Sequence, residues 1–370
     1  MRTRAKISDR IREFYRNMDW VLFAATLALM ITGGFVVKSA TAATDPMMFN
    51  RQLIWYAAGL IMMFVFANIN YNHLLALGSH LYWLFVAILI LVLLVGHEAL
   101  GAQRWIKIAG FQFQPSELMK IILPFAVIRF ILVRQKESFT LKNIGKMLLM
   151  VALPALLILR QPDLGSALLI LLVLFVIFYV GNMPPKKLII LVLAAVMLMP
   201  VAYMALKDYQ RQRLAVFVNP QIDPLGAGYN VIQSQIAVGS GGLLGKGYMQ
   251  GTQSQLNFIP IKYTDFVFAV ITEETGFAGG LFIIALYFIL TMQGLRIVKL
   301  SRYSGGKMAA ASLITIIFSQ FVINTGMNIG IMPVTGITLP LLSYGGTSVL
   351  VTMIAIGILQ NIYREYMKAE

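Results

Sequence analysis

The chain has 370 residues, of which 59% are hydrophobic and only 12% are charged, and its mean hydropathy is +0.78. A soluble domain of this length needs far more charge to solvate its surface, so the composition excludes that class and indicates an integral membrane protein. The formal net charge of +15 does not indicate nucleic acid as a partner, because most Lys and Arg residues lie in short segments between long apolar runs.

Ten apolar segments recur along the chain, and most approach the ~20 residues that a helix needs to cross a ~30 Å hydrocarbon layer. No segment alternates between apolar and polar residues in the manner of a membrane β-barrel. We therefore predict an all-α integral membrane protein that forms a single polytopic domain over 1–370. The predicted transmembrane helices lie at 20–37, 52–68, 74–95, 116–133, 147–159, 165–181, 188–205, 266–293, 309–328 and 346–362.

The basic residues predict how the chain crosses the membrane. Lys and Arg concentrate on one side of the apolar segments, so the positive-inside rule places residues 1–19 in the cytoplasm. An even number of spans then places the C-terminus there as well. The first apolar run, 20–37, is longer than the core of a secretory signal, and we interpret it as a retained anchor. The basic residues before it are Arg2, Arg4, Lys6, Arg10, Arg12 and Arg16.

One connection, 207–264 between the seventh and eighth predicted helices, is much longer than the others. The predicted topology places it outside the cytoplasm, on the periplasmic side. It is rich in Gln, Gly, Asn and Pro, but its apolar periodicity around 231–238 predicts partial order. Its Gly-rich stretch 239–247 resembles a phosphate-binding loop only superficially, because Ser240 and Gly247 stand where that motif requires Gly and Ser or Thr. We predict no nucleotide site.

Asp265 follows Thr264 at the end of this loop and opens the eighth predicted helix. A carboxylate at a helix start is favoured by the helix dipole, so Asp265 can be a cap. It can also be a general base at the membrane–water boundary, where a lipid-linked substrate would present its polar head. The two roles are compatible, and the residues alone leave both open.

Other ionisable groups lie within predicted spans. Glu117 and Lys120 open the fourth helix, and their spacing puts them on one face. Ionisable groups in a membrane segment are costly, so this pair indicates either a functional site or a structural ion pair. Glu273 and Glu274 lie deeper in the eighth helix and require a partner or a water-filled cavity.

Several cations lie outside, against the positive-inside trend. Guanidinium groups bind diphosphates through paired hydrogen bonds, although lipid headgroups or ordinary loop charge are the more common explanation for any single cation. The motif RQPDLGSA at 160–167 predicts a turn with Asp163 as a helix cap. The outward-facing cations are Arg51, Arg104, Lys107, Arg160, Arg211, Arg213, Lys246 and Lys262.

The segment 324–348, NTGMNIGIMPVTGITLPLLSYGGTS, resembles the signature of the SEDS (shape, elongation, division and sporulation) family. Further motifs match that family in order across nearly the whole chain, and they resemble its elongation member more than its division member. These motifs are GAQRWIKIAGFQFQPSELMK, QPDLGSA, KDYQRQR, DPLGAGYNVIQSQIAVGSGGLLGKG and TDFVFAVITEETG.

The resemblance implies a peptidoglycan glycosyltransferase that polymerises lipid II into β-1,4 glycan strands at the outer face of the bacterial cytoplasmic (inner) membrane during cell elongation. By resemblance, the essential aspartate of the family falls on Asp265, and its acid–lysine pair on Glu117 and Lys120. One departure stands out, since Ile261 and Tyr263 replace an acid and a histidine that often precede the aspartate. More of the proton transfer would then rest on Asp265.

The chemistry that the resemblance implies is one inverting displacement of undecaprenyl diphosphate, with Asp265 as general base. Cations would compensate the charge of the leaving group, and a divalent cation such as Mg²⁺ or Mn²⁺ could assist. No nucleotide or organic cofactor is expected. The expected partners are a class B penicillin-binding protein, which is a transpeptidase, and other membrane proteins of the elongation complex. The candidate diphosphate-binding or supporting residues are Glu117, Lys120, Arg51, Arg104, Arg211, Arg213 and Lys246.

Two other functions stay open at this stage. A lipid II flippase would use the same cations, and the intramembrane Glu273 and Glu274 favour it. A scaffold that only organises a transpeptidase would need no base at all. The long outer loop and Asp265 favour the enzyme.

Overall fold

The computed structural model describes residues 16–368, apart from 43, 100–101, 109–110, 205 and 227. Ten helices of 17 residues or more lie within this part of the chain, one for each predicted span. Seven of them are long and apolar enough to cross a membrane by length and composition. The long helices are α2 (Trp20–Thr41), α3 (Met47–Asn68), α4 (Tyr71–Val95), α5 (Pro115–Arg134), α6 (Leu141–Arg160), α7 (Leu164–Val180), α8 (Pro185–Met204), α12 (Val267–Leu300), α13 (Ser304–Asn328) and α14 (Gly346–Met367).

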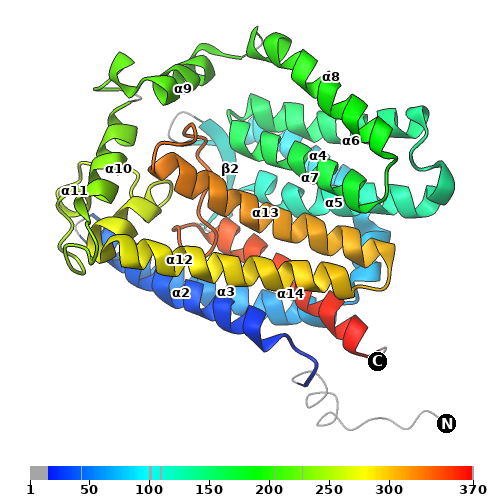
Figure 1. Cartoon of the computed structure of the whole chain (residues 1–370), viewed down its shortest axis with the longest axis horizontal. Helices are drawn as coiled ribbons and strands as arrows, with labels where there is room; N and C mark the ends of the chain where they lie inside the picture. Colours follow the sequence, from blue (N-terminus) through cyan, green and yellow to red (C-terminus); the bar gives the residue numbers. More distant parts are fainter. Residues whose placement is uncertain are drawn as a thin grey trace.

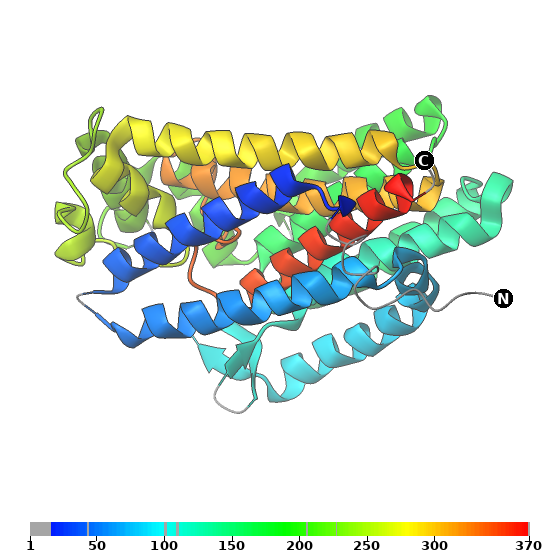
Figure 2. The same cartoon turned by 90° about the horizontal axis from the view of Figure 1, so that it is seen from below.

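The long helices run roughly side by side along the length of the molecule (Figures 1 and 2). α14 packs mainly against α3, α4 against α5, and α12 against α13 and α2. One continuous apolar core joins them. α8 lies at the edge of the bundle (Figure 1), where Met197 and Met204 are each more than three-quarters exposed.

α2 begins and α14 ends at the same end of the bundle (Figure 2). The backbone N–H of Asp19 donates to Gln360 Oε1 at 2.9 Å, and Gln360 Nε2 donates back to the carbonyl of Asp19 at 2.9 Å. This reciprocal pair fixes the start of α2 on α14. The predicted cytoplasmic segment 1–19 lies mostly outside the described residues, which begin at Arg16.

Most helices are longer than the predicted spans, and α6 and α12 differ most. α6 begins at Leu141 rather than 147, because its first turns carry Lys142 and Lys146 and so lie outside the apolar run that defined the prediction. α12 continues to Leu300 and is interrupted at Gly276, where φ is 69° and ψ is −164°. Only glycine adopts such a backbone conformation without strain.

The opposite end of the bundle carries the long connections. A small antiparallel sheet precedes α5, with strand order β1 (His97–Ala99), β2 (Ala102–Ile108) and β3 (Phe111–Phe113). The register pairs Trp105 with His97, and Ile106 with Phe113. The all-α prediction omitted this sheet, because two of its three strands have only three residues and are too short to show a periodicity of their own.

Residues 207–264 are folded against this end of the bundle (Figure 1). They form three short helices and one 3₁₀ turn, in agreement with the predicted partial order. These elements are α9 (Asp208–Val218), η2 (Pro220–Ile222), α10 (Tyr229–Ser240) and α11 (Thr252–Gln255).

Candidate active site

Asp265 lies in the turn before α12. Phe266 is the N-cap residue of that helix, so the predicted cap role of Asp265 is wrong. The backbone of Asp265 is fixed instead, because its carbonyl accepts hydrogen bonds from Asn324 Nδ2 and Asn328 Nδ2, both at 3.0 Å. The two asparagines lie one turn apart on α13 and are fully buried. The asparagines therefore fix the backbone of Asp265 without occupying its carboxylate oxygens.

The same two asparagines join four parts of the fold around Asp265. Asn324 Nδ2 also donates to the carbonyl of Ile337 in the loop before α14, at 2.8 Å. Asn328 Oδ1 accepts the backbone N–H of Ala269 on α12 at 3.0 Å, and its carbonyl accepts Ser234 Oγ of α10 at 2.9 Å. Sequence reasoning missed both residues, although their i,i+4 spacing in the motif NTGMN is a usable signal.

The surroundings of Asp265 shift its protonation. Burial raises the pKa of its carboxyl above the ordinary aspartate value. The guanidinium of Arg213, the Thr264 hydroxyl and the guanidinium of Arg104 oppose this rise in pKa, whereas the charge of Asp163 adds to it. Asp265 is thus a stronger base than an exposed aspartate and faces two cations.

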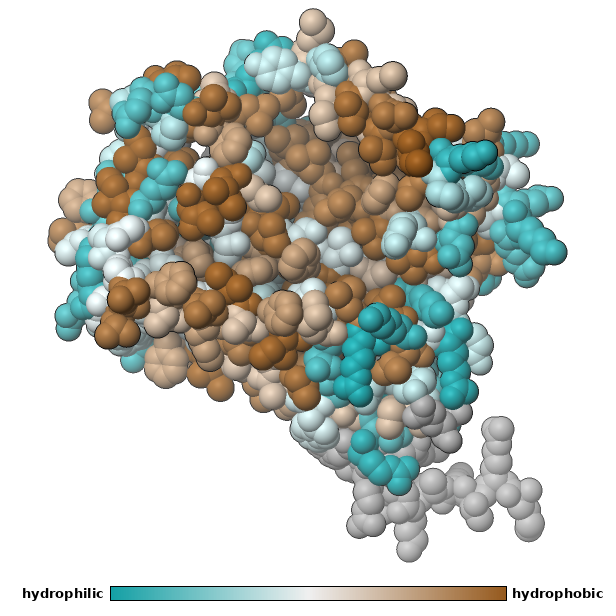
Figure 3. Space-filling view, in the orientation of Figure 1, coloured by the Kyte–Doolittle hydropathy of each residue, from teal (hydrophilic) through white to brown (hydrophobic). Residues whose placement is uncertain are grey.

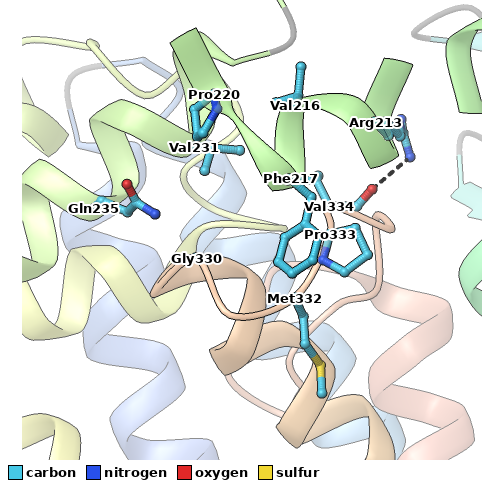
Figure 4. A pocket seen from close by; sticks show the side chains of 10 residues that line it. All are labelled: Arg213, Val216, Phe217, Pro220, Val231, Gln235, Gly330, Met332, Pro333 and Val334. Carbon is cyan, nitrogen blue, oxygen red and sulfur yellow. Dashed lines mark hydrogen bonds between the residues drawn. The ribbon is translucent and has the colours of Figure 1, made fainter. Parts of the chain in front are cut away.

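Both cations are anchored by backbone carbonyls. Arg213 of α9 donates from Nη1 to the carbonyl of Val334 at 3.3 Å (Figure 4). Arg104 of β2 donates from Nε to the carbonyl of Gln161 at 2.6 Å and from Nη2 to the carbonyl of Pro162. The sheet and α9 therefore each hold one of the two guanidinium groups whose charge acts on Asp265.

Arg213 also lines a small pocket between α9, α10 and the loop that follows α13 (Figure 4). Its other walls are mostly apolar, and Phe217 and Pro333 face one another across it. The loop that forms this wall continues to Gly336, where an added Cβ would lie 3.8 Å from Asp265 Oδ2. One loop therefore forms a wall of the pocket and also approaches the carboxylate of Asp265.

Asp163 caps α7, as predicted, because Oδ1 accepts the backbone N–H of Ser166 at 3.0 Å. Its second oxygen, Oδ2, accepts from Gln114 Nε2 at 3.3 Å, which connects this turn to the start of α5. The prediction of a cap is confirmed, but the sequence did not indicate that Asp163 acts electrostatically on Asp265.

Glu117 and Lys120 form a buried ion pair on the first turns of α5, with 2.6 Å between Lys120 Nζ and Glu117 Oε1. Gln114, the N-cap of that helix, is the residue that contacts Asp163. The helix that carries the pair is therefore connected to the turn that holds Asp163 and binds Arg104. A role of the pair in the chemistry stays a prediction.

Three other predicted cations lie apart from Asp265. Lys246 pairs with Glu273 at 2.8 Å. Arg211 donates to the carbonyl of Met204 at 2.6 Å and lies 5.9 Å from the centre of the Tyr203 ring. Arg51 is exposed on the first turn of α3. None of the three is among the charged groups that shift the pKa of Asp265 within the described residues.

Tyr263 occupies the place of the missing histidine. Burial raises the pKa of its phenol, and the charges of Tyr344, Asp45 and Asp265 raise this pKa further. Its ring packs edge-on against that of Tyr344, with 6.0 Å between ring centres. Tyr263 is therefore neutral near pH 7 and cannot share the role of a base.

The family model for cell cycle proteins of the FtsW, RodA and SpoVE type matches residues 17–368. The chain belongs to this family. It is 41% identical over 348 residues to the peptidoglycan glycosyltransferase MrdB of Escherichia coli K12, covering 94% of each chain. It is 30% identical over 422 residues to the peptidoglycan glycosyltransferase RodA of Treponema pallidum, covering 94% of this chain and 97% of that one.

Solved structures show the FtsW/RodA/SpoVE fold as well. One is described as the structural coordination of polymerization and crosslinking by a peptidoglycan synthase complex, with a TM-score of 0.82, 31% identity, and coverage of 94% of this chain and 98% of that chain. Another is the crystal structure of the rod shape determining protein RodA of Thermus thermophilus, with a TM-score of 0.71, 29% identity, and coverage of 94% and 97%. The resemblance found in the motifs is confirmed.

Among the described residues, no group of three or more His, Asp or Glu side chains is close enough to hold a metal ion. A cage made of protein ligands alone is therefore not built in this part of the chain. Mg²⁺ is commonly held by one or two carboxylates together with substrate phosphates, so a metal requirement stays a prediction.

Proposed function

We propose that this chain is a peptidoglycan glycosyltransferase that polymerises lipid II, with Asp265 as its general base. The activity follows from membership of the FtsW/RodA/SpoVE family and from the relatives named as peptidoglycan glycosyltransferases. The observation that supports the base is the carboxylate of Asp265, whose backbone is held by Asn324 and Asn328 and whose charge faces Arg104 and Arg213.

The proposed reaction is a single displacement at the anomeric carbon of the donor. The 4-hydroxyl oxygen of the acceptor sugar forms the new C–O bond as the C–O bond to undecaprenyl diphosphate breaks. Asp265 accepts the hydroxyl proton, and its raised pKa makes it a more effective base. One attack from the opposite face inverts the donor, so an α-linked diphosphate becomes a β-1,4 linkage without a covalent intermediate.

The leaving diphosphate needs charge compensation more than it needs an acid. Arg104 and Arg213 are the guanidinium groups placed to supply it, through charge-assisted hydrogen bonds to the phosphate oxygens. Glu117 and Lys120 would support the start of α5 beside them. A divalent cation would add positive charge there, but no step above depends on it.

The proposal places the site at the outer face of the bacterial inner membrane, with both termini in the cytoplasm. The two polyprenyl chains would stay in the lipid while the sugars meet at the loop-covered end of the bundle. A class B penicillin-binding protein is the proposed crosslinking partner. The similarity to a peptidoglycan synthase complex that coordinates polymerization and crosslinking supports this partner.

Asp265→Asn tests the base. This variant keeps the size of the side chain but cannot accept the proton, so glycan strands should no longer form from purified lipid II. Asp208→Asn, an exposed aspartate on the first turn of α9, is the matched control and should polymerise normally. Near-normal synthesis by folded Asp265→Asn would exclude Asp265 as the base. Scrambling of lipid II without any polymer from the wild type would indicate a flippase.

A further inference from the structure

Glu273 lies on α12 and takes no part in the proposed reaction, yet it is fully buried. Its carboxylate accepts four hydrogen bonds from the outer segment, one from Lys246 and three from the turn at 252–254. Lys246 Nζ and the backbone N–H of Gln253 donate to Oε1 at 2.8 Å, and the Thr252 hydroxyl donates at 3.2 Å. The backbone N–H of Ser254 donates to Oε2 at 3.0 Å. These partners answer the question that the sequence left open, and they remove the feature that favoured a flippase.

The Gly-rich stretch docks on the break in α12 beside this carboxylate. The conformation of Gly276 separates the carbonyls of Glu273 and Glu274 from the N–H groups of Phe277 and Ala278, which would be their partners in a regular helix. The outer segment replaces the lost bonds. The backbone N–H groups of Lys246 and Gly247 donate to the backbone carbonyls of Glu273 and Glu274, respectively, at 3.0 Å each. In the other direction, the N–H groups of Phe277 and Ala278 donate to the carbonyls of Gly242 and Leu243 at 2.8 and 3.1 Å.

The turn at 252–254, which is bound by Glu273, also binds the segment just before Asp265. The carbonyl of Ser254 accepts a hydrogen bond from Lys262 Nζ, which also donates to Asn257 Oδ1 at 2.7 Å. Lys262 is a buried cation three residues before Asp265. The backbone N–H of Ser254 is thus bound by Glu273, and the carbonyl of the same residue is bound by Lys262.

We propose that Glu273 is a positioning residue of the glycosyltransferase, which sets the place of Asp265 through Ser254 and Lys262. The proposal rests on the proposed function. A carboxylate is suited to this role because it binds two adjacent backbone N–H groups and an ammonium group at once, which a neutral side chain cannot do. A misplacement of ~1 Å at a reacting group can lower a rate ~100-fold, so a remote contact of this kind matters.

The neighbouring Glu274 provides a matched control. It is also buried on α12, but it accepts from Ser39 Oγ of α2 and from Gln255 Nε2, and not from the Ser254 peptide. Glu273→Gln should therefore lower kcat for lipid II polymerisation by ~10- to 100-fold with a much smaller change in KM, while Glu274→Gln should lower kcat less than about threefold. Equal losses in the two variants would overturn the proposal, because the bond to Ser254, which only Glu273 makes, could not explain them.

Lys262→Met tests the connection without touching Glu273. It should lower kcat to a similar extent, and the double variant Glu273→Gln, Lys262→Met should be no worse than either single variant. Multiplicative losses in the double variant would show that the two residues act separately. A lost kcat for Lys262→Met with normal Glu273→Gln activity would also contradict the proposal.

A measurement independent of activity separates this inference from the proposed function. The chain has no cysteine, so Leu256→Cys, at an exposed position just after α11, takes a single spin label. The label should become more mobile with Glu273→Gln and should be unchanged with Asp265→Asn. An unchanged label in Glu273→Gln would overturn the inference. Full activity of Asp265→Asn would instead overturn the assigned base and leave the label result standing.

Discussion

At the scale of single residues, two effects act against each other on the pKa of Asp265, namely the burial of its carboxyl and the charges of two guanidinium groups. Burial favours the protonated form, and Arg213 and Arg104 favour the charged form. The pKa of Asp265 is raised on balance, which suits proton acceptance, while the cations limit the rise. The same two cations would meet the diphosphate, so binding of the donor should reduce their effect on Asp265.

This balance predicts a pH dependence of polymerisation. Activity needs ionised Asp265, so the rate should be full above its raised pKa and should fall as the pH is lowered through it, at a higher pH than for an ordinary aspartate. Arg213→Gln removes the largest opposing charge and should move this acid limb to still higher pH. Arg211→Gln, two residues earlier on α9, should leave the position of the limb unchanged. Profiles of kcat/KM against pH check both variants, and an acid limb that Arg213→Gln does not move would contradict this electrostatic account.

The sequence predicted some of these residues and not others, for a physical reason. Asp265 and the Glu117–Lys120 pair were visible because a charge beside or within an apolar run is costly and therefore informative. Asn324 and Asn328 are neutral, and a neutral amide in a helix is a weaker sequence signal than a charge. Only the folded structure shows that they hold the Asp265 carbonyl. Lys246 stays a predicted diphosphate ligand, and its ion pair with Glu273 could not be foreseen because the two residues are 27 positions apart.

At the scale of elements, the apolar runs predicted the ten long helices, but they did not predict the sheet and the short helices that form the site. Hydrophobic length is a strong signal, because every backbone group in lipid must be bonded internally. The sheet β1–β2–β3 and the short helices α9 to α11 have no such signal. They are stabilised by contacts with other elements, such as Ser234 of α10 with Asn328 and Arg104 of β2 with the turn after α6.

The break in α12 predicts a sharp difference between two glycines. In Gly276→Ala, the new Cβ would lie 2.3 Å from the backbone nitrogen of Gly245, and φ would remain at 69°. Backbone strain of this kind costs about 1–3 kcal/mol, and the clash adds to it, so Gly276→Ala should lower the thermal unfolding temperature clearly. In Gly239→Ala, on α10, the Cβ meets nothing within 4 Å, and the change should be neutral or stabilise by up to ~1 kcal/mol. Thermal unfolding in detergent checks both, and equal stability of the two variants would contradict the docked loop.

At the scale of the whole molecule, apolar side chains cover most of the face shown in Figure 3, and hydrophilic side chains gather toward its left and right sides. This is the distribution expected when the middle of a bundle faces lipid and its ends face water. One end carries the α5–α6 and α12–α13 connections with their Lys and Arg residues, and the other carries the sheet, α9 to α11 and Asp265. By the positive-inside rule, we propose that the first end faces the cytoplasm.

This assignment predicts which exposed residues can be labelled from outside an intact cell. Leu225, between η2 and α10, is 91% exposed, and Tyr303, between α12 and α13, is 70% exposed. Because the chain has no cysteine, Leu225→Cys and Tyr303→Cys each introduce a single thiol at the two opposite ends of the bundle. A membrane-impermeant maleimide should label Leu225→Cys on spheroplasts and should label Tyr303→Cys only after the membrane is opened. The reverse pattern would place Asp265 on the cytoplasmic side, where a nascent glycan strand could not join the wall, and would exclude the proposed polymerase.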